Sequence, residues 1–406
     1  LCTRCFRHTT PSLPYAADAF KAFQRNFLGV YLCMMMADWM QGPYVYALYE
    51  HYGFTIGQIG QLFIVGFGSS MVFGTFIGSL ADRYGRKANA IIFAVMYSLS
   101  CFTKHSPRYD VLLLSRLLGG VATSILMSAF ETWMVHEHKA GGFPEEWLSG
   151  TFSNMTFGNG MVAIVAGIIA SGLAANFGPV APFDASLVLL VLGGIAIATS
   201  WKENYGDNRA DARVCNNFRA AWSVLASNEK VFLLGLIQSC FEGAMYIFVF
   251  MWAPALEATL GKDEKLPHGL VFAGFMICVM IGSRLFSSLL AIQPVEALSR
   301  LVFLVATAAL AVPVLVQGTK PVLFSFCVFE ICCGIYFPSI GTMRGKFVPE
   351  EVRSTVMNIF RIGLNIIVVL VLANIGDMAH DTVFMLCALL LTLACLCQHR
   401  LFILAS

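Results

Sequence analysis

The sequence predicts an all-α polytopic membrane protein made of two six-helix bundles. Three observations support this: the chain is very apolar, its apolar runs are long enough to cross a bilayer, and its two halves resemble each other. Hydrophobic residues make up 58% of the 406 residues and charged residues only 12%, whereas a soluble domain carries about 25% charge. The net charge of +2, without a basic stripe or stacking platform, predicts no nucleic-acid partner.

Twelve apolar runs approach the length of roughly 20 residues that a bilayer crossing requires. They begin near Phe23, Gln58, Ala88, Tyr109, Phe152, Ala181, Val231, Pro267, Ala297, Pro321, Arg353 and Thr382. The 35 glycines suit close packing of helices in lipid. The lipid bilayer is therefore an expected partner of the whole chain. Because the chain opens with Leu1 rather than Met, we expect a further segment before it.

The distribution of Lys and Arg predicts the orientation. If both termini lie on one side of twelve spans, 18 of the 26 Lys and Arg residues fall on that side and 5 on the other. The remaining three, Arg116, Arg284 and Arg361, lie within spans. Positively charged segments stay in the cytosol, so the N- and C-termini are predicted to be cytosolic.

A long polar stretch divides the spans into two sets of six. We predict an N-terminal bundle over residues 1–200, a cytosolic linker over 201–230 and a C-terminal bundle over 231–406. Such an interruption between equal sets of spans is typical of two separately packed bundles.

The two halves also match at a nearly constant offset. "FPEEWLSGTF" at 143–152 resembles "VPEEVRSTVM" at 348–357, and Gly78 with its following Ser recurs at Gly282. Asp38 in the first span has Glu242 as its counterpart in the seventh. Such duplication is typical of transporters, which bind their substrate near the midplane where the halves meet.

A dense charged turn, "GSLADRYGRK" at 78–87, separates the second and third spans. It resembles the signature loop of the major facilitator superfamily, G-x-L-(A)-D-(R)-x-G-R-K, with every key position filled. The resemblance implies the major facilitator fold, in which two six-helix bundles are related by a pseudo-two-fold axis along the membrane normal. It also implies alternating access, with this turn as a gate latch.

The latch assigns a role to each charged residue of the turn. In the family its Asp bonds a helix N-terminus in the other half, where an anion is favoured; here Asp82 would meet the start of the eleventh span near Arg353. Arg83 and Arg86 would reach acids at the end of the fourth span. Those acids are Glu131 or Glu137. Ordinary positive-inside anchoring is the alternative explanation for the turn.

Two glycines and one arginine complete the gating set. Gly78 would allow two helices to approach closely, and Gly85 would permit a tight turn. Arg116 with Gly120 fits the family's second motif, an Arg on the fourth span. We leave open whether Arg116 acts on the approach path of the substrate or tethers helices.

Further stretches narrow the resemblance. They are "ADWMQGPYVYALYEHY" (37–52), "SAFETWMVHEH" (128–138), "GPVAPF" (178–183), "WKENY" (201–205), "FVFMWAP" (248–254) and "YFPS" (336–339). Together they resemble the molybdate-anion transporter family over nearly the whole chain. The resemblance implies uptake of molybdate across the plasma membrane rather than an internal one, and we expect a monomer. The alternatives are another oxyanion such as sulfate, an organic solute, or a non-transporting receptor or scaffold.

Molybdate is a tetrahedral dianion, so its site should offer cations and neutral hydrogen-bond donors. Arg361 lies about 12 Å into its span at 1.5 Å per residue, and Asn358 and Asn365 share its helix face. We expect this face to bind substrate, with a structural ion pair of Arg361 as the alternative. The half-repeat counterparts in the fifth span are Ser153, Thr156 and Asn159. They would supply further donors or bond neighbouring helices.

Arg284 is a weaker candidate for substrate binding. By the repeat it aligns with Leu80 at the cytosolic end of its span, so we expect it to serve a degenerate second latch.

The spans also contain three acidic residues, Asp38, Glu242 and Glu330. Ionised carboxylates would repel a dianion at low dielectric, so these residues would oppose substrate binding if they stayed ionised. Either they pair with a cation such as Arg361 and release it on binding, or they take up protons with the substrate. Since desolvation favours the protonated carboxyl, we favour the second alternative for Asp38 and Glu242, and it predicts proton-coupled symport.

No catalytic motif is present. The chain lacks an HExxH pair, a phosphate-binding Gly loop with its Lys and a nucleophile elbow. The sequence therefore predicts no enzyme activity, no cofactor and no metal site.

Overall fold

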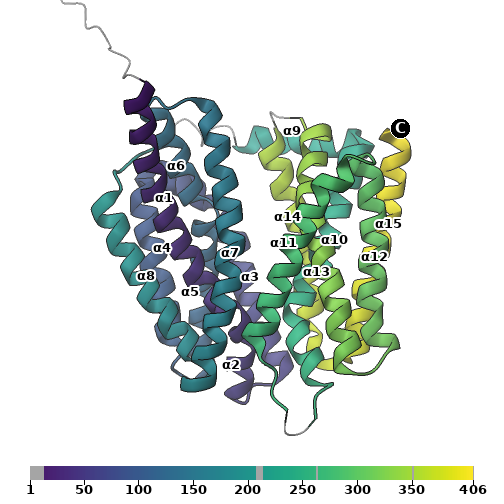
Figure 1. Cartoon of the computed structure of the whole chain (residues 1–406). Coiled ribbons are helices and arrows are strands. Elements are labelled where there is room, and N and C mark those ends of the chain that lie inside the picture. The colour runs from purple at the N-terminus through teal and green to yellow at the C-terminus, as the bar shows by residue number, and fades with distance from the viewer. Residues whose placement is uncertain (1–12, 207–213, 262–263, 350–351, 406) are drawn as a thin grey trace, which may run out of the picture.

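The structure is a computed structural model that describes residues 13–206, 214–261, 264–349 and 352–405. These residues form helices and connecting turns, without a strand among them, in two groups that stand side by side (Figure 1). The side chain of Asp82 and the surroundings of Gly78 lie outside the described part.

The first half contains α1 (Leu13–Gln41), η1 (Gly42–Tyr44), α2 (Val45–His51), α3 (Ile56–Tyr84), α4 (Arg86–Thr103), α5 (Tyr109–Leu126), α6 (Ala129–Ala140), α7 (Glu145–Phe177) and α8 (Ala181–Ser200). The second half contains α9 (Val214–Ser227), α10 (Glu229–Glu257), α11 (His268–Leu290), α12 (Val295–Leu315), α13 (Thr319–Phe347), α14 (Arg353–Ala373), η4 (Ile375–Asp377) and α15 (His380–Ala405). The helices of the two halves follow one another in the same order. In this correspondence, the segment from α1 through η1 to α2 matches the segment formed by α9 and α10.

The twelve expected spans correspond to α1, α3, α4, α5 with α6, α7, α8 and α10 to α15. Among the described residues, ten helical segments are long and apolar enough to cross a membrane. The exceptions are α1 and α4. Charged residues lower their hydropathy, since α1 carries Asp18, Lys21 and Asp38 and α4 opens with Arg86 and Lys87. Both nevertheless pack along the first half, α1 against α7 and α8 and α4 against α5 and α8.

The two halves touch at the end of the molecule away from α9, which we call the opposite end; the end that carries α9 is the linker end (Figure 1). At the opposite end, Gly167 of α7 and Gly269 of α11 meet so closely that a Cβ on Gly167 would lie 2.7 Å from the Gly269 carbonyl oxygen. A Cβ on Gly60 of α3 would lie 2.7 Å from Ile375 of η4. Toward the linker end, the ribbons of α7 and α11 diverge (Figure 1). The halves are thus closed against each other at the opposite end.

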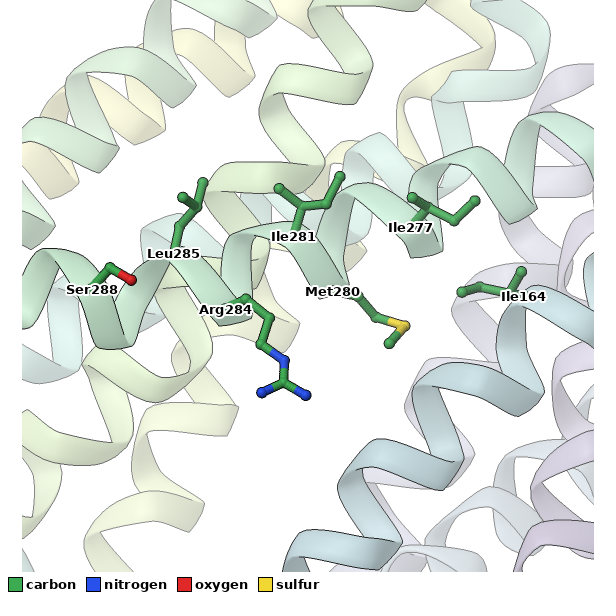
Figure 2. Close-up of a pocket in the computed structure, with 7 residues that line it drawn as sticks. All are labelled: Ile164, Ile277, Met280, Ile281, Arg284, Leu285 and Ser288. Carbon is green, nitrogen blue, oxygen red and sulfur yellow. The ribbon is translucent and has the colours of Figure 1, made fainter.

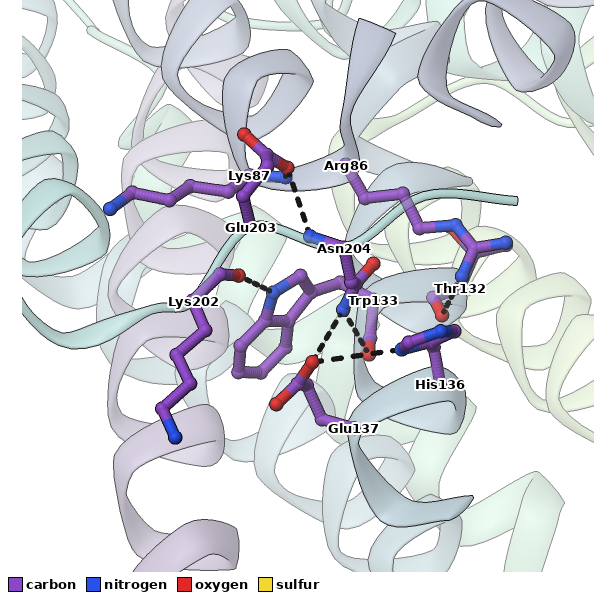
Figure 3. A network of polar contacts seen from close by, with 9 residues as sticks. All are labelled: Arg86, Lys87, Thr132, Trp133, His136, Glu137, Lys202, Glu203 and Asn204. Atoms are coloured by element: carbon purple, nitrogen blue, oxygen red, sulfur yellow. Dashed lines mark hydrogen bonds and ion pairs between the residues drawn. The ribbon is translucent and has the colours of Figure 1, made fainter. Parts of the chain in front are cut away.

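The first residues of the expected linker pack on the first half (Figure 3). The ring of Trp201 stacks on that of Trp133 in α6, with centroids 3.8 Å apart and planes 9° apart. The indole nitrogen of Trp133 donates to the Lys202 carbonyl oxygen at 2.8 Å. We call this arrangement of residues 201–204 the clasp.

The clasp also holds the charged turn. The Glu203 carboxylate accepts hydrogen bonds from the backbone nitrogens of Lys87 at 2.8 Å and Ala88 at 3.1 Å, so it caps the N-terminus of α4, where the helix dipole favours an anion. Gly85, between α3 and α4, has φ of 106°, a conformation open to glycine and strained for other residues. A Cβ there would also lie 2.5 Å from the Glu203 carboxylate, so both the turn and the cap require glycine.

We expect Gly85→Ala to destabilise the protein by roughly 1–3 kcal/mol through backbone strain, with an added loss from the displaced Glu203 cap. Thermal unfolding of the purified protein in detergent measures this as a lower Tm. Gly150→Ala is the matched control, because Gly150 lies in α7 with no atom within 4 Å of its Cβ position. A Tm for Gly85→Ala equal to that of the control would contradict the assignment.

Candidate functional site

A buried carboxylate with several donors lies between α10 and α13. One oxygen of Glu242 accepts from the Arg344 guanidinium at 3.1 Å and from the Tyr336 hydroxyl at 3.0 Å. Its other oxygen accepts from the Gln238 amide at 3.2 Å, and the Gln238 oxygen accepts from Arg344 Nε at 3.2 Å. The Glu242 side chain is 12% exposed and that of Arg344 25%. The pair is therefore largely desolvated, yet its guanidinium remains accessible.

The local sequence explains why these groups converge. Gln238, Glu242 and Tyr246 follow one another at intervals of four residues, so they share one face of α10. Tyr246 meets Phe67 of α3 edge-on at 5.3 Å, which places this face at the boundary between the halves. Tyr336 is held by stacking of its ring on Phe241 at 3.9 Å, so its hydroxyl is positioned before any ligand arrives.

Arg361 adds a second cation from α14. Its side chain is exposed, and its charge is a smaller influence on the Glu242 carboxylate than that of Arg344. The helices α10 and α14 approach closely because glycines lie between them: a Cβ on Gly363 would lie 2.5 Å from the Ser239 hydroxyl oxygen, and that hydroxyl donates to the Phe360 carbonyl oxygen at 3.2 Å. One carboxylate thus lies in the field of two guanidinium groups from different helices, an excess of positive charge that suits an anion.

Both asparagines expected beside Arg361 lie on α14. The Asn365 amide donates to the Arg361 carbonyl oxygen at 2.7 Å, so its donor is used within α14. Asn358 is exposed on the same helix. Helical spacing placed their Cα atoms on one face, but it does not fix where each side chain bonds.

The fifth-span candidates lie on α7 in the other half. Asn159 accepts a hydrogen bond from the Trp39 indole at 2.8 Å, which joins α7 to α1. The Thr156 hydroxyl donates to the Phe152 carbonyl oxygen within its own helix at 3.0 Å, and Ser153 is exposed. Ser153, Thr156 and Asn159 were expected either to donate to substrate or to bond neighbouring helices. In the structure, Asn159 makes a bond to a neighbouring helix.

The other two acidic candidates have different surroundings. Asp38 accepts a hydrogen bond from the Tyr97 hydroxyl at 2.6 Å, so each half carries one carboxylate bonded to a tyrosine. Glu330, on α13, is 8% exposed. Within the described part of the chain, no hydrogen bond or ion pair reaches Glu330.

Arg116 tethers helices of the first half. Its Nε donates to the Leu62 carbonyl oxygen at 3.2 Å, and its guanidinium lies 4.6 Å from the Phe63 ring centroid. A Cβ on Gly66 would meet this guanidinium, so Gly66 makes room for it. Of the two roles left open for Arg116, these contacts fit tethering of α5 to α3.

Two arginines of the charged turn, Arg83 and Arg86, lie at the junction of α3 and α4. Arg83 is exposed and lies over the ring of its neighbour Tyr84 at 5.4 Å. Arg86 donates to the Thr132 carbonyl oxygen at 3.4 Å, while Glu137 accepts from Asn204 at 2.9 Å (Figure 3).

Two further latch residues lie on α6 and at the start of α14. Glu131 is exposed on α6. Arg353 donates to the Val348 carbonyl oxygen at 3.1 Å, within the second half. The expected contact of Asp82 with the start of α14 falls on a side chain outside the described part.

A cavity of about 430 Å³ lies between α7 and α11 (Figure 2). Its lining is mainly apolar, with Ile164 from the first half and Ile277, Ile281 and Leu285 among the residues of the second. The Arg284 guanidinium projects from α11 into the space between the two helices (Figure 2). Arg284, expected as part of a second latch, therefore lines a cavity between the halves.

The comparisons with known proteins agree with this architecture. A family model described as sugar transporters with 12 TM matches residues 8–329. The molybdate-anion transporter of Xenopus tropicalis is 36% identical over 97% of this chain and 90% of its own length. That of Takifugu rubripes is 34% identical over 89% of this chain and 81% of its own length.

The chain belongs to the molybdate-anion transporter family. A crystal structure of the nucleoside transporter NupG superposes with a TM-score of 0.76, covering 94% of this chain and 99% of that one, at 12% identity. At that identity the likeness concerns the fold alone. The chain thus has the major facilitator fold, and it is an integral membrane transporter protein rather than an enzyme.

Sequence reasoning missed Arg344, Gln238 and Tyr336 of the α10–α13 site. Arg344 lies three residues before the end of α13, where an arginine is expected as a positive-inside anchor. The available signal was the spacing of four residues between Gln238 and Glu242, which placed a second polar group beside the predicted carboxylate.

We expect Arg344→Gln to lower the free energy of unfolding by about 3 kcal/mol, because it leaves a desolvated carboxylate without its main partner. Glu242→Gln in the same chain should recover most of this loss, since the remaining amides can bond each other. Unfolding of the two single variants and the double variant measures the coupling energy. The exposed pair Arg400 and Glu229, treated in the same way, is the control, with an expected coupling below about 1 kcal/mol. Additive effects at Arg344 and Glu242 would contradict the pairing.

Proposed function

We propose that this protein is a secondary-active transporter that imports molybdate across the plasma membrane by alternating access, coupled to protons. Membership of the molybdate-anion transporter family supports the substrate class. The observation that carries the proposal is the position of the Glu242 carboxylate, bonded to Arg344 and within the field of Arg361. In the absence of substrate, this carboxylate would take the place of the transported anion.

The charges explain how substrate and proton would be linked. A tetrahedral dianion beside two guanidinium groups leaves no net charge, whereas an ionised Glu242 in the same site leaves a net charge of −1. At low dielectric that excess is costly, so binding of the dianion would favour protonation of Glu242. Arg344 is then free to turn from the carboxylate to the oxyanion, for which its planar fork provides paired hydrogen bonds. At this site, one proton would be taken up for each molybdate bound.

Asp38 is the second proposed proton carrier, because it occupies the matching place in the first half and is bonded by Tyr97 alone among the described residues. Glu330 stays a third candidate, as a buried acid on α13 without an ionic partner in the described part. Asn358, Asn365, Ser153 and Thr156 are proposed as neutral donors that would reorient when substrate enters.

The conformation fits a state open toward the cytosol. If the linker and both termini are cytosolic, the contacts of Gly60, Gly167 and Gly269 close the outer end. The latch residues Gly78, Asp82, Arg83, Gly85, Arg86 and Arg353 are then proposed to join the halves at the linker end in the alternate state, with Arg116 and Glu131 supporting them. Arg284 is proposed to attract the anion along the passage between α7 and α11.

Sulfate and sugars are the alternative substrates. Sulfate has the same shape and charge, so the site would bind it unless the size of the anion is sensed. The sugar description of the matching family would require a site of neutral hydrogen-bond partners, and two guanidinium groups around one acid favour an anion instead. A receptor or scaffold has no need of a cation pair between two bundles.

We expect cells that lack their own molybdate uptake to accumulate labelled molybdate at nanomolar concentration when they express the full-length protein. Arg361→Gln and Arg344→Lys should each reduce uptake at least tenfold at equal surface abundance, a loss of about 1.4 kcal/mol of binding. Arg344→Lys keeps the charge and removes the paired hydrogen bonds. Arg400→Gln, at an exposed ion pair, should leave uptake unchanged. Uptake abolished by excess sulfate would replace molybdate by a general oxyanion, and the lack of uptake by a surface-localised protein would exclude molybdate.

We expect uptake to rise as the external pH falls, because the carriers must bind protons before the loaded protein changes state. Asp38→Asn combined with Glu242→Gln should remove this pH dependence, since an amide does not titrate. The measurement is the initial rate of uptake between pH 5.5 and 8. The control is Glu229→Gln, which changes an exposed acid of the same half. An unchanged pH profile in the double variant would refute proton carriage by these two residues.

A further inference from the structure

The cavity between α7 and α11 lies at an edge where the halves meet. The halves pack on each other mainly through two helix pairs, α7 with α11 and α3 with α14. The first pair stands in front of the other helices in Figure 1. Ile277, Ile281 and Leu285 of the lining are 46%, 45% and 41% exposed. The cavity is therefore open at its side, where the apolar surface of a membrane-spanning bundle meets lipid.

The lining of the cavity changes from apolar to polar along α11 (Figure 2). The helix begins at the opposite end, where Gly269 meets α7, and it ends at Leu290. Along its axis, Ile277 lies about 10 Å from Arg284 toward the opposite end, and Ser288 lies about 6 Å from Arg284 toward the linker end. An apolar wall thus lies deep in the bundle, with a cation and a hydroxyl nearer the surface.

The two polar groups of the lining have no protein partner in the described part of the chain. No hydrogen bond or ion pair reaches the Arg284 guanidinium or the Ser288 hydroxyl there. α11 and α7 from Trp147 onward contain no Asp or Glu, so neither wall supplies a carboxylate. A guanidinium is always protonated in proteins. The cavity therefore holds a positive charge that its own walls do not balance.

An oxyanion alone satisfies only part of this cavity, because it bonds the polar end and leaves the apolar wall without a partner. The volume of about 430 Å³ is within the range of about 300–1,000 Å³ that sites for larger molecules occupy. A phospholipid of the linker-end leaflet carries both parts in the order required, with its phosphate near the surface and its acyl chains toward the middle of the bilayer.

The depth of the cation also suits a phospholipid. Arg284 lies about 9 Å before the end of α11, and the long arginine side chain extends its charged group toward the membrane surface. The guanidinium thereby comes within reach of the phosphate layer. Basic pockets between transmembrane helices bind anionic lipid head groups in this way.

We propose that the cavity between α7 and α11 is a binding site for an anionic phospholipid of the leaflet at the linker end. Its phosphate accepts hydrogen bonds from the Arg284 guanidinium and the Ser288 hydroxyl. One acyl chain lies along Ile281 and Ile277 of α11 and against Ile164 of α7. An anionic head group is favoured over a zwitterionic one, since a choline cation would lie beside the unbalanced guanidinium.

A lipid at this site would act on the movement between the halves. Its chain contacts both walls, so it opposes a rotation that brings α7 and α11 together at the linker end. Its phosphate would also neutralise the charge of Arg284, which is proposed to attract the transported anion. Both consequences rest on the proposed function, whereas binding of the lipid does not.

Lipid binding to the purified full-length protein tests the site directly. In native mass spectrometry from detergent, dioleoyl phosphatidylserine should bind at least tenfold more tightly than dioleoyl phosphatidylcholine, a difference of about 1.4 kcal/mol. A diazirine in its acyl chain should cross-link to the peptides that contain Ile164 and Ile277. Inorganic phosphate should not displace the lipid, because it leaves the apolar wall unfilled. Displacement by phosphate at equal concentration would overturn the assignment to a lipid.

One substitution distinguishes this site from the lipid that surrounds any membrane protein. Arg284→Gln should lower the affinity for phosphatidylserine at least tenfold, remove its preference over phosphatidylcholine and weaken both cross-links. Arg400→Gln is the matched control, because Arg400 is an exposed arginine at the same end of the same half with Glu229 as its partner. It should leave the affinity unchanged. Equal binding of the two lipids by the wild-type protein, or an undiminished preference in Arg284→Gln, would overturn the proposal. Failure of molybdate uptake alone would leave it standing.

Discussion

The Glu242 carboxylate imposes the constraint on which the second half depends. A charge within an apolar bundle must be compensated, and here one guanidinium, one phenol and one amide share that task. These partners come from α10 and α13, so the requirement fixes the contact of the two helices, the stacking of Tyr336 on Phe241 and the orientation of Gln238. A second guanidinium, Arg361, lies in the same field without a carboxylate of its own among the described residues. The charges that fix these helix contacts are thus the same ones that we propose to receive the anion.

The sequence predicted much of the fold because bilayer crossing leaves a strong signal, namely long apolar runs with short polar breaks. Glu242 and Arg361 were also found from the sequence, since a charge inside such a run is conspicuous. Arg344 was not, because near a helix end an arginine is ordinary; only the reach of its side chain back to Glu242 reveals its role. The Asn365 amide bonds a carbonyl of its own helix, a detail that the sequence could not predict because spacing positions the backbone and leaves the rotamer open.

At the charged turn, the principle that an anion is favoured at a helix N-terminus applies at a place the sequence did not indicate. The sequence suggested a carboxylate from the turn at the N-terminus of a helix in the other half. In the described structure, the helix that receives a carboxylate at its N-terminus is α4, within the turn itself, and the acid is Glu203 from the clasp. Nothing in "WKEN" distinguishes it from an ordinary solvated linker, because its polar residues act through the neighbouring Trp133 and through two backbone nitrogens that sequence patterns do not display.

The contact of Gly167 with Gly269 also has a mechanical meaning. α7 extends from Glu145 to Phe177, so at 1.5 Å per residue the contact divides it into arms of about 33 Å toward the linker end and about 15 Å toward the opposite end. With two backbones touching and no side chain between them, this point would act as a fulcrum in the proposed alternating access. A rotation that separates the short arms by a few ångströms moves the long arms about twice as far, so a small displacement at one surface is amplified at the other.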